Sequence, residues 1–284
     1  MSTGIVFHAL AALSYLGLAL FLWRALSSGK PVHSSGKLIR VGVLFALVLH
    51  GLGLHDLIIA DKQLHLNWAI AMSAAVWLGM VVFWIESLVL TADGLLLLLL
   101  PAGAFTALLA AIFPTAQIVA HAAEPAVRIH LLIALCAYGL VTIAALQAIL
   151  MATLDRRLHH PRESSAERSP IRLAIGRILD AQPPLLAQER LLFRVVWVAF
   201  AALGLAVVTG SMIALDLTGK WLPFDHKTIF TLLSWVTFGA LLAGRYLWGW
   251  RGRIALRYTL VGFAFIVLSY TGSRFVIEVI LQRG

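Results

Sequence analysis

Residues 129–152 read IHLLIALCAYGLVTIAALQAILMA and contain no Asp, Glu, Lys or Arg. A helix of about 20 apolar residues crosses a hydrocarbon core about 30 Å thick. Inside lipid every backbone polar group must be hydrogen-bonded within the protein, so only helices and closed barrels span membranes. The stretch therefore predicts a transmembrane helix, with His130 just inside one of its ends.

The rest of the chain repeats this pattern. Its 284 residues are 61% hydrophobic and 12% charged, with a mean hydropathy of +0.93, and the charges fall between the apolar runs. The first run has no basic segment before it, so we interpret it as a span kept in the mature protein. The predicted fold is all-α, a polytopic helix bundle forming a single transmembrane domain, 1–284. We expect about eight spans, at about 4–23, 39–58, 67–89, 95–113, 129–152, 191–214, 227–248 and 256–279.

The basic residues predict the orientation of the bundle. In a soluble protein a net charge of +9 would suggest a nucleic-acid partner, whereas in a membrane protein Lys and Arg mark the cytoplasmic loops. Of the 22 Lys and Arg residues, 15 lie in the loops after the first, fifth and seventh runs, and 6 lie on the opposite face. We therefore expect both termini on the outer, periplasmic side, and no nucleic-acid partner.

The longest loop, at about 153–190, is rich in arginine and is cytoplasmic in this orientation. Its segment IRLAIGRIL, residues 171–179, has the spacing of a short helix that would lie on the anionic inner leaflet. A flexible linker is equally compatible with the composition, so both interpretations stay open.

Patterns that support catalysis are missing. Cys136 is the single cysteine, which excludes a thiol relay, a zinc knuckle and a CxxCH attachment site for haem. The sequence shows no acid–base dyad, nucleophile triad or phosphate-binding loop. We therefore expect a protein that is not an enzyme.

The histidines are the polar residues whose presence in and near the apolar runs most needs an explanation. Neutral imidazole binds haem iron through one ring nitrogen, but a buried histidine often only hydrogen-bonds a neighbouring helix. The residues alone leave both roles open. His8, in the first turns of the first run, has no evident partner. Six of the ten histidines fall in the predicted outer half: His50, His55, His65, His121, His130 and His226.

Three further polar or small-residue patterns bear on the bundle. Arg274 and Glu278 are one helical turn apart and are expected to pair, although Arg274 would also suit an anionic ligand together with Arg128 and Lys227. Asn67 is expected to cap the third span. Small residues spaced four apart predict close contacts between helices; one such set is Ala71, Ala75 and Gly79.

Several stretches resemble the cytochrome c assembly family, the CcsA/CcmC-like haem-handling proteins. They are AVRIHLLIALCAYGLVTIAALQAILMATLDRRL (126–158), ERLLFRVVWVAFAALGLAVVTGSMIAL (189–215), and a third segment with DHKT (225–228), SW (234–235) and GWRGR (249–253). The family's tryptophan-rich outer stretch is replaced by LTGKWLPFDHKT (217–228), and its second outer histidine is absent from the end of the chain. These departures, with His50 in the second span and LNW at 66–68, fit the YpjD/HemX-like branch better.

The resemblance implies a bacterial inner-membrane protein that binds, exports or presents haem, with haem b as the cofactor. His130 matches the first of the family's paired outer histidines. His50 is a candidate ligand within the bundle, and His226 is a hypothetical second outer ligand. Arg128, Lys227 or Arg274 would receive the propionates. The implied partners are haem, other cytochrome c maturation proteins and the lipid bilayer. The alternative is a regulatory or scaffold protein without haem that acts through its arginine-rich loop.

Overall fold

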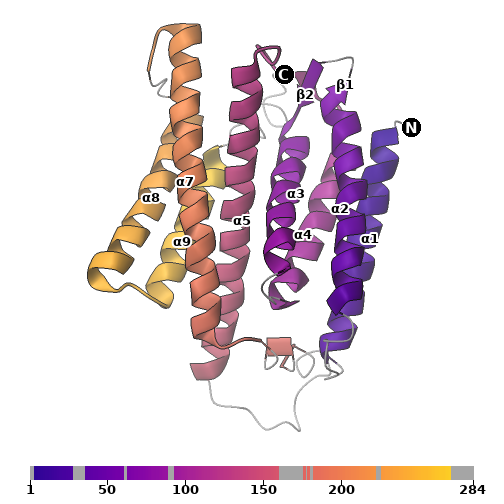
Figure 1. Ribbon diagram of the computed structural model, residues 1–284, viewed down its shortest axis with the longest axis vertical. Helices are drawn as coiled ribbons and strands as arrows, with labels where there is room; N and C mark the ends of the chain where they lie inside the picture. The colour runs from indigo at the N-terminus through magenta and orange to yellow at the C-terminus, as the bar shows by residue number, and fades with distance from the viewer. Residues whose placement is uncertain are drawn as a thin grey trace.

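A computed structural model shows a bundle of long helices (Figure 1). It describes residues 3–27, 36–60, 63–88, 93–159, 175–176, 178–179, 182–221 and 225–269. The main helices are α1 (Thr3–Ser27), α2 (Gly36–Ile58), α3 (Trp68–Ser87), α4 (Asp93–Ile112), α5 (Pro125–His159), α7 (Leu185–Thr218), α8 (His226–Trp248) and α9 (Arg253–Val267).

Consecutive helices run in opposite directions along the bundle (Figure 1). Seven of those described are long and apolar enough to cross a membrane, which confirms a polytopic helical bundle. The described part of α9 has 15 residues, and the predicted eighth span at 256–279 continues beyond the described residues. The count of eight spans and the orientation of the termini therefore stay predictions.

The surface of the bundle is apolar where lipid would cover it. Large hydrophobic side chains point outward near the middle of helices; Leu13, Phe45, Val208 and Val236 are each more than half exposed. In water, such contiguous apolar surface would drive association. Against hydrocarbon it has no such cost, so the surface supports the membrane assignment independently of helix length.

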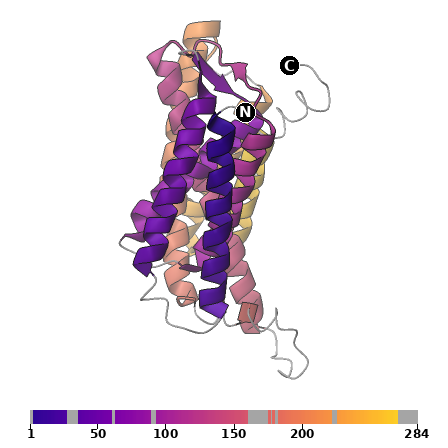
Figure 2. The same ribbon diagram turned by 90° about the vertical axis from the view of Figure 1, so that its right-hand side faces the viewer.

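Three short strands, which the sequence did not lead us to expect, lie at the end of the bundle where α1 begins. β1 (Ile59–Ala60), β2 (Gln63–Leu66) and β3 (Gln117–Ile118) form a small antiparallel sheet in the order β1-β2-β3. We call this end the strand end; Figure 2 shows the strands above indigo α1 and its neighbour α2. The pairing of strands far apart in sequence depends on tertiary contacts, which short loops do not reveal.

Asn67 ties the strand end together, as its predicted capping role suggested. Its Oδ1 accepts a hydrogen bond of 2.7 Å from the amide of Ile70 at the start of α3. Its Nδ2 donates to the carbonyls of Phe113 and Thr115, at 2.7 and 2.8 Å, just after α4. One buried side chain thereby satisfies backbone groups of two helix ends.

The bundle has two main hydrophobic cores that meet between α3 and α5. The first is built mainly from α1, α2, α3 and α4, and the second from α5, α7, α8 and α9. At their junction Gly79 and Gly139 bring the two backbones together: a Cβ added at Gly139 would lie 2.1 Å from the carbonyl oxygen of Ala75. The predicted small-residue face of the third span is thus confirmed as a close helix contact.

The opposite end of the bundle carries the arginine-rich loops, and we call it the arginine end. The helices α5 and α7 extend beyond their neighbours there (Figure 1), so both ends of the predicted 153–190 loop are helical. Arg245 of α8 pairs with the nearly buried Glu189 of α7 at 2.5 Å. Glu86 of α3 pairs with Arg194 of α7 at 3.4 Å. Most of the segment 171–179 lies outside the described residues.

Candidate functional site

A pocket of about 190 Å³ opens among α5, α7 and α8 in the half of the bundle nearer the strand end. Its walls combine apolar side chains with an imidazole, a lysine, a carboxylate and several hydroxyls. The lining residues are His130, Ala134, Tyr138, Ala206, Val207, Gly210, Ser211, Asp225, Lys227, Thr228 and Thr231. A pocket with a few polar groups in apolar walls is the usual form of a ligand site.

The hydrogen bonds around His130 favour one tautomer of its ring. Its Nδ1 lies 2.9 Å from Oγ1 of Thr209 on α7. That hydroxyl already donates its only proton to the carbonyl of Leu205, at 2.8 Å. With that proton on the carbonyl, the hydroxyl oxygen accepts from Nδ1–H, and the lone pair of the neutral ring is on Nε2.

This arrangement is the one that metal-binding histidines use. Such a histidine donates its second ring N–H to a protein acceptor, which orients the ring and increases the basicity of the ligating nitrogen. Nε2 of His130 stands beside Gly210 in the pocket wall, where an added Cβ would come within 3.5 Å of it. The absence of a side chain at Gly210 therefore keeps space next to the free nitrogen.

The start of α8 supplies the polar side of the pocket. Asp225 caps the helix, because its Oδ1 accepts a hydrogen bond of 2.7 Å from the backbone amide of Thr228. Thr231 and Ser269 share a hydrogen bond of 2.8 Å, and the Ser269 hydroxyl also lies 2.9 Å from the carbonyl oxygen of Lys227. These contacts fix the first turns of α8 against the chain just after α9, so the lysine and both threonines enter the wall from a rigid element.

Comparison with known proteins places this architecture in a family. A family model described as cytochrome C assembly protein matches residues 39–281. The chain belongs to the cytochrome c assembly family. Membership connects it with cytochrome c biogenesis.

Individual relatives agree with this. The inner membrane protein YpjD of Escherichia coli K12 is 26% identical over 243 residues, 84% of this chain and 86% of the relative. An uncharacterized 28.8 kDa protein of Azospirillum brasilense is 30% identical over 224 residues, 76% of this chain and 78% of the relative. The cytochrome c biogenesis protein CcsA of Trichodesmium erythraeum is 30% identical over 104 residues, 37% and 27% of the two chains. This family member is thus a YpjD-like, multi-pass protein of the bacterial inner membrane.

The structure brings two of the predicted outer residues to the pocket and leaves two others, Arg128 and His226, away from its wall. His130 and Lys227 line it. Arg128, two residues before His130, is exposed and donates from Nε to the carbonyl of Ala122 at 2.5 Å. His226 is exposed at the start of α8 and is not among the lining residues. Arg274, with its expected partner at 278, lies outside the described residues.

His50 lies in a different place, in the first half of the bundle. It is fully buried, with Nε2 2.8 Å from the Ser73 hydroxyl and Nδ1 3.3 Å from the Tyr15 hydroxyl. Both ring nitrogens are therefore engaged with neighbouring helices. An iron atom could bind His50 only if one of these hydrogen bonds broke.

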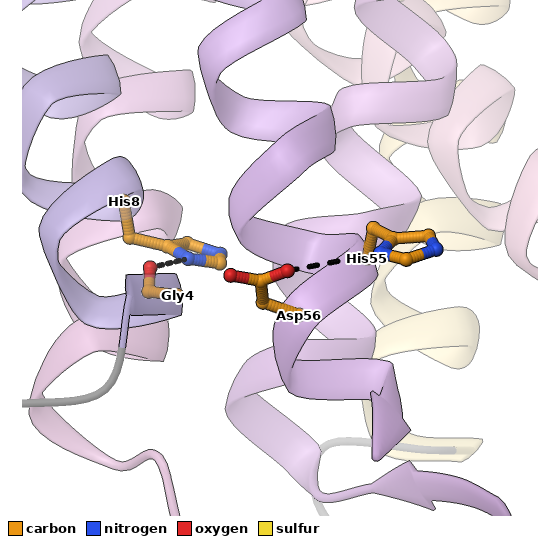
Figure 3. Close-up of polar contacts among 4 residues, drawn as sticks. All are labelled: Gly4, His8, His55 and Asp56. Atoms are coloured by element: carbon orange, nitrogen blue, oxygen red, sulfur yellow. Dashed lines mark hydrogen bonds and ion pairs between the residues drawn. The ribbon is translucent and has the colours of Figure 1, made fainter. Parts of the chain in front are cut away.

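His8 joins His50 in this buried cluster, so it does have neighbours that the sequence did not reveal. The two rings meet edge to face, 5.3 Å between centroids. Nδ1 of His8 donates to the carbonyl of Gly4 at 2.9 Å (Figure 3), while its buried Nε2 has no hydrogen-bond partner among the residues that the structure describes. Figure 3 also shows the ion pair of Asp56 and His55, 3.7 Å long, on the adjacent turn of α2.

Within the described ranges no three His, Cys, Asp or Glu side chains come together in a way that would hold a metal ion. His65 lies in β2 and His121 in the turn after β3, both at the strand end, and His121 is 3.6 Å from Glu124. The predicted convergence of outer histidines therefore reduces, in the described residues, to His130 at the pocket.

Sequence reasoning missed the residues that position His130. Thr209 is polar within an apolar run, and Thr209, Gly210 and Ser211 form a polar or small triplet in the last third of α7. That triplet was the available signal, because an apolar helix has little other reason to carry it. Its pairing with His130, 79 positions away in sequence, could not be read from one chain.

Proposed function

We propose that this protein is a haem-handling member of the cytochrome c assembly family that binds haem, of the b type, and presents it at the outer face of the inner membrane. His130 is the proposed iron ligand. The observation that carries the proposal is the hydrogen bond from His130 Nδ1 to Thr209, because it leaves Nε2 free and orients the ring beside a pocket. The family's association with cytochrome c biogenesis supports haem as the ligand.

The pocket suits one edge of a porphyrin. Its volume of about 190 Å³ is below the roughly 300–1,000 Å³ of sites that enclose a whole ligand. The remainder of the ring system would lie against the apolar surfaces of the helices and lipid. Lys227 in the wall, and Arg128 at the start of the same helix as His130, are the cations placed to receive propionates.

The other candidate ligands receive less support. His50 would have to give up a hydrogen bond to Ser73 or Tyr15 before it could bind iron. His226 is exposed and outside the pocket wall. It could act as a second iron ligand only for a haem that extended beyond the pocket toward the strand end.

In this proposal the chain has no bond chemistry of its own. It orients a haem iron, neutralises propionates and limits water at one face, while the redox and ligand-exchange chemistry belongs to the haem. The strand end is the outer side, following the distribution of Lys and Arg. The alternative is a scaffold acting through the arginine-rich loop at about 153–190, part of which, including residues 160–174, lies outside the described ranges.

The test is optical. The protein is purified from haem-replete cells and its reduced-minus-oxidised absorption spectrum recorded, followed by haem titration of the Thr209→Val and His130→Ala variants. Thr209→Val keeps the shape of the side chain but removes the acceptor of Nδ1–H, and should weaken haem affinity by about 10- to 100-fold. His130→Ala should abolish the Soret band at the occupancy that the parent protein shows.

Thr237→Val is the matched control. Thr237 also donates to the carbonyl four residues earlier, Leu233, at 2.7 Å, but among the described residues no histidine hydrogen-bonds to its hydroxyl. Its haem affinity should equal that of the parent. A parent protein without a Soret band after haem supplementation would refute the function. A band that survives His130→Ala but disappears in His50→Ala would move the site to the buried cluster.

A further inference from the structure

The turn between α8 and α9 is a well-defined structural element. Gly249 and Gly252 adopt positive φ angles of 67° and 53°, which side-chain-bearing residues rarely adopt. Between them Trp250 packs on Gly244, where an added Cβ would lie 2.2 Å from its ring. The ring of Trp250 also contacts Tyr258, 5.0 Å between centroids. The turn therefore holds its neighbouring side chains in fixed positions.

Exposed apolar and aromatic side chains lie directly before this turn. Tyr246, Leu247 and Trp248 form the last turn of α8 and are 89%, 63% and 69% exposed. The turn lies at the lower left of Figure 1, on the opposite side of the bundle from α1 and α2. Tyr and Trp at the end of a membrane-spanning helix sit at the boundary between acyl chains and headgroups.

Three exposed arginines surround the same turn. Arg251, Arg253 and Arg257 form no ion pair or hydrogen bond with any side chain that the structure describes. Arg245 differs, because its charge is neutralised by Glu189 and its guanidinium stacks on Phe193 at 3.7 Å. Three uncompensated positive charges therefore lie next to a strip of aromatic surface.

We propose that this surface, the turn patch (Tyr246, Leu247, Trp248, Arg251, Arg253 and Arg257), is a binding site for the headgroup of an anionic phospholipid. The guanidinium groups match phosphate geometrically and by charge, and the aromatic strip contacts the adjoining acyl chains. A soluble anion would use the arginines but would leave the aromatic strip without a role. The occupant is therefore a lipid, and the site is independent of haem binding at His130.

Each cation close to an anionic membrane surface contributes about a factor of five in affinity. Removal of all three should thus weaken the binding of an anionic lipid by roughly a hundredfold. The experiment is native mass spectrometry of the full chain in detergent, with phosphatidylglycerol and phosphatidylcholine added in equal amounts. The parent should retain phosphatidylglycerol preferentially, and the Arg251→Gln/Arg253→Gln/Arg257→Gln variant should lose that preference.

The matched control removes the same charge elsewhere at the arginine end. Arg24→Gln/Lys37→Gln/Arg156→Gln changes three exposed cations on α1, α2 and α5, and it should keep the preference for phosphatidylglycerol. An equal loss in both triple variants would show a diffuse charge effect and overturn the site. Equal retention of both lipids by the parent would also overturn it.

A fourth variant distinguishes a lipid from a free anion. Tyr246→Ala/Trp248→Ala keeps every arginine, so it should weaken phosphatidylglycerol binding while leaving the response to inorganic phosphate unchanged. If this variant binds the lipid as the parent does, or if inorganic phosphate displaces the lipid from the parent at equal concentration, the patch is a general anion site and the proposal fails. Elution volume and thermal unfolding of each variant confirm that it is folded.

Discussion

Replacing Gly139 with alanine tests whether the contact between α3 and α5 holds the two halves of the bundle together. The added Cβ would lie 2.1 Å from the carbonyl oxygen of Ala75 and 2.8 Å from the amide nitrogen of Gly79. Ordinary contact begins at 3.4 Å, so the two helices would have to separate by about 1.3 Å. Both obstacles are backbone atoms of a helix, so no rotamer change can relieve the clash.

Overpacking of this kind typically costs 1–3 kcal/mol, and occasionally more. Because relief requires movement of whole helices, we expect the upper part of the range, about 3 kcal/mol. For a chain of this size that corresponds to a fall in melting temperature on the order of 5–10 °C. The assay is thermal unfolding of the purified protein in one detergent, followed by intrinsic tryptophan fluorescence.

Gly17→Ala provides the comparison. Gly17 is also inside a helix, but an added Cβ there would meet nothing within 4 Å. Alanine forms helix better than glycine by about 0.5–1 kcal/mol, so this variant should be as stable as the parent or slightly more stable. Equal melting temperatures for the two variants would refute the packing argument.

Three further substitutions test local contacts by the same unfolding assay. Ser73→Ala leaves a nitrogen of the buried His50 ring without its partner and should cost 1–3 kcal/mol; an unchanged melting temperature would contradict the hydrogen bond. Arg245→Gln leaves a nearly buried carboxylate unpaired and should cost about 2 kcal/mol, whereas Arg194→Gln, in a more exposed pair, should cost under about 1 kcal/mol. Asp225→Ala removes the cap of α8 and should cost about 1 kcal/mol, with faster amide hydrogen exchange confined to the first turn of that helix.

The sequence predicted the helices well because each membrane helix is defined by the residues of its own segment. Runs of about 20 apolar residues define membrane helices without reference to any other part of the chain. The expected span at 227–248 and the observed α8, for example, differ by one residue at the start. The long extensions of α5 and α7 were missed because residues beyond the hydrocarbon core need not be apolar.

The candidate site was harder to predict, because it depends on pairs of residues that are distant in sequence. His130 was identified from its position and from family resemblance, but the role of Thr209 depends on α5 and α7 packing side by side. His50 illustrates the opposite case. Its position near mid-bilayer suggested a ligand, and only the structure shows that Ser73 and Tyr15 occupy both of its ring nitrogens.

The lengths of α5 and α7 have a mechanical consequence. At 35 and 34 residues these packed helices are each about 50 Å long, against a hydrocarbon core of about 30 Å. His130 lies near one end of α5 and Arg156 near the other, about 40 Å apart on one continuous helix. A ligand that tilted α5 against α7 by about 5° at the pocket would displace the far end by about 3 Å. Such a tilt at the pocket near the strand end would therefore be transmitted along the helix pair to the arginine end.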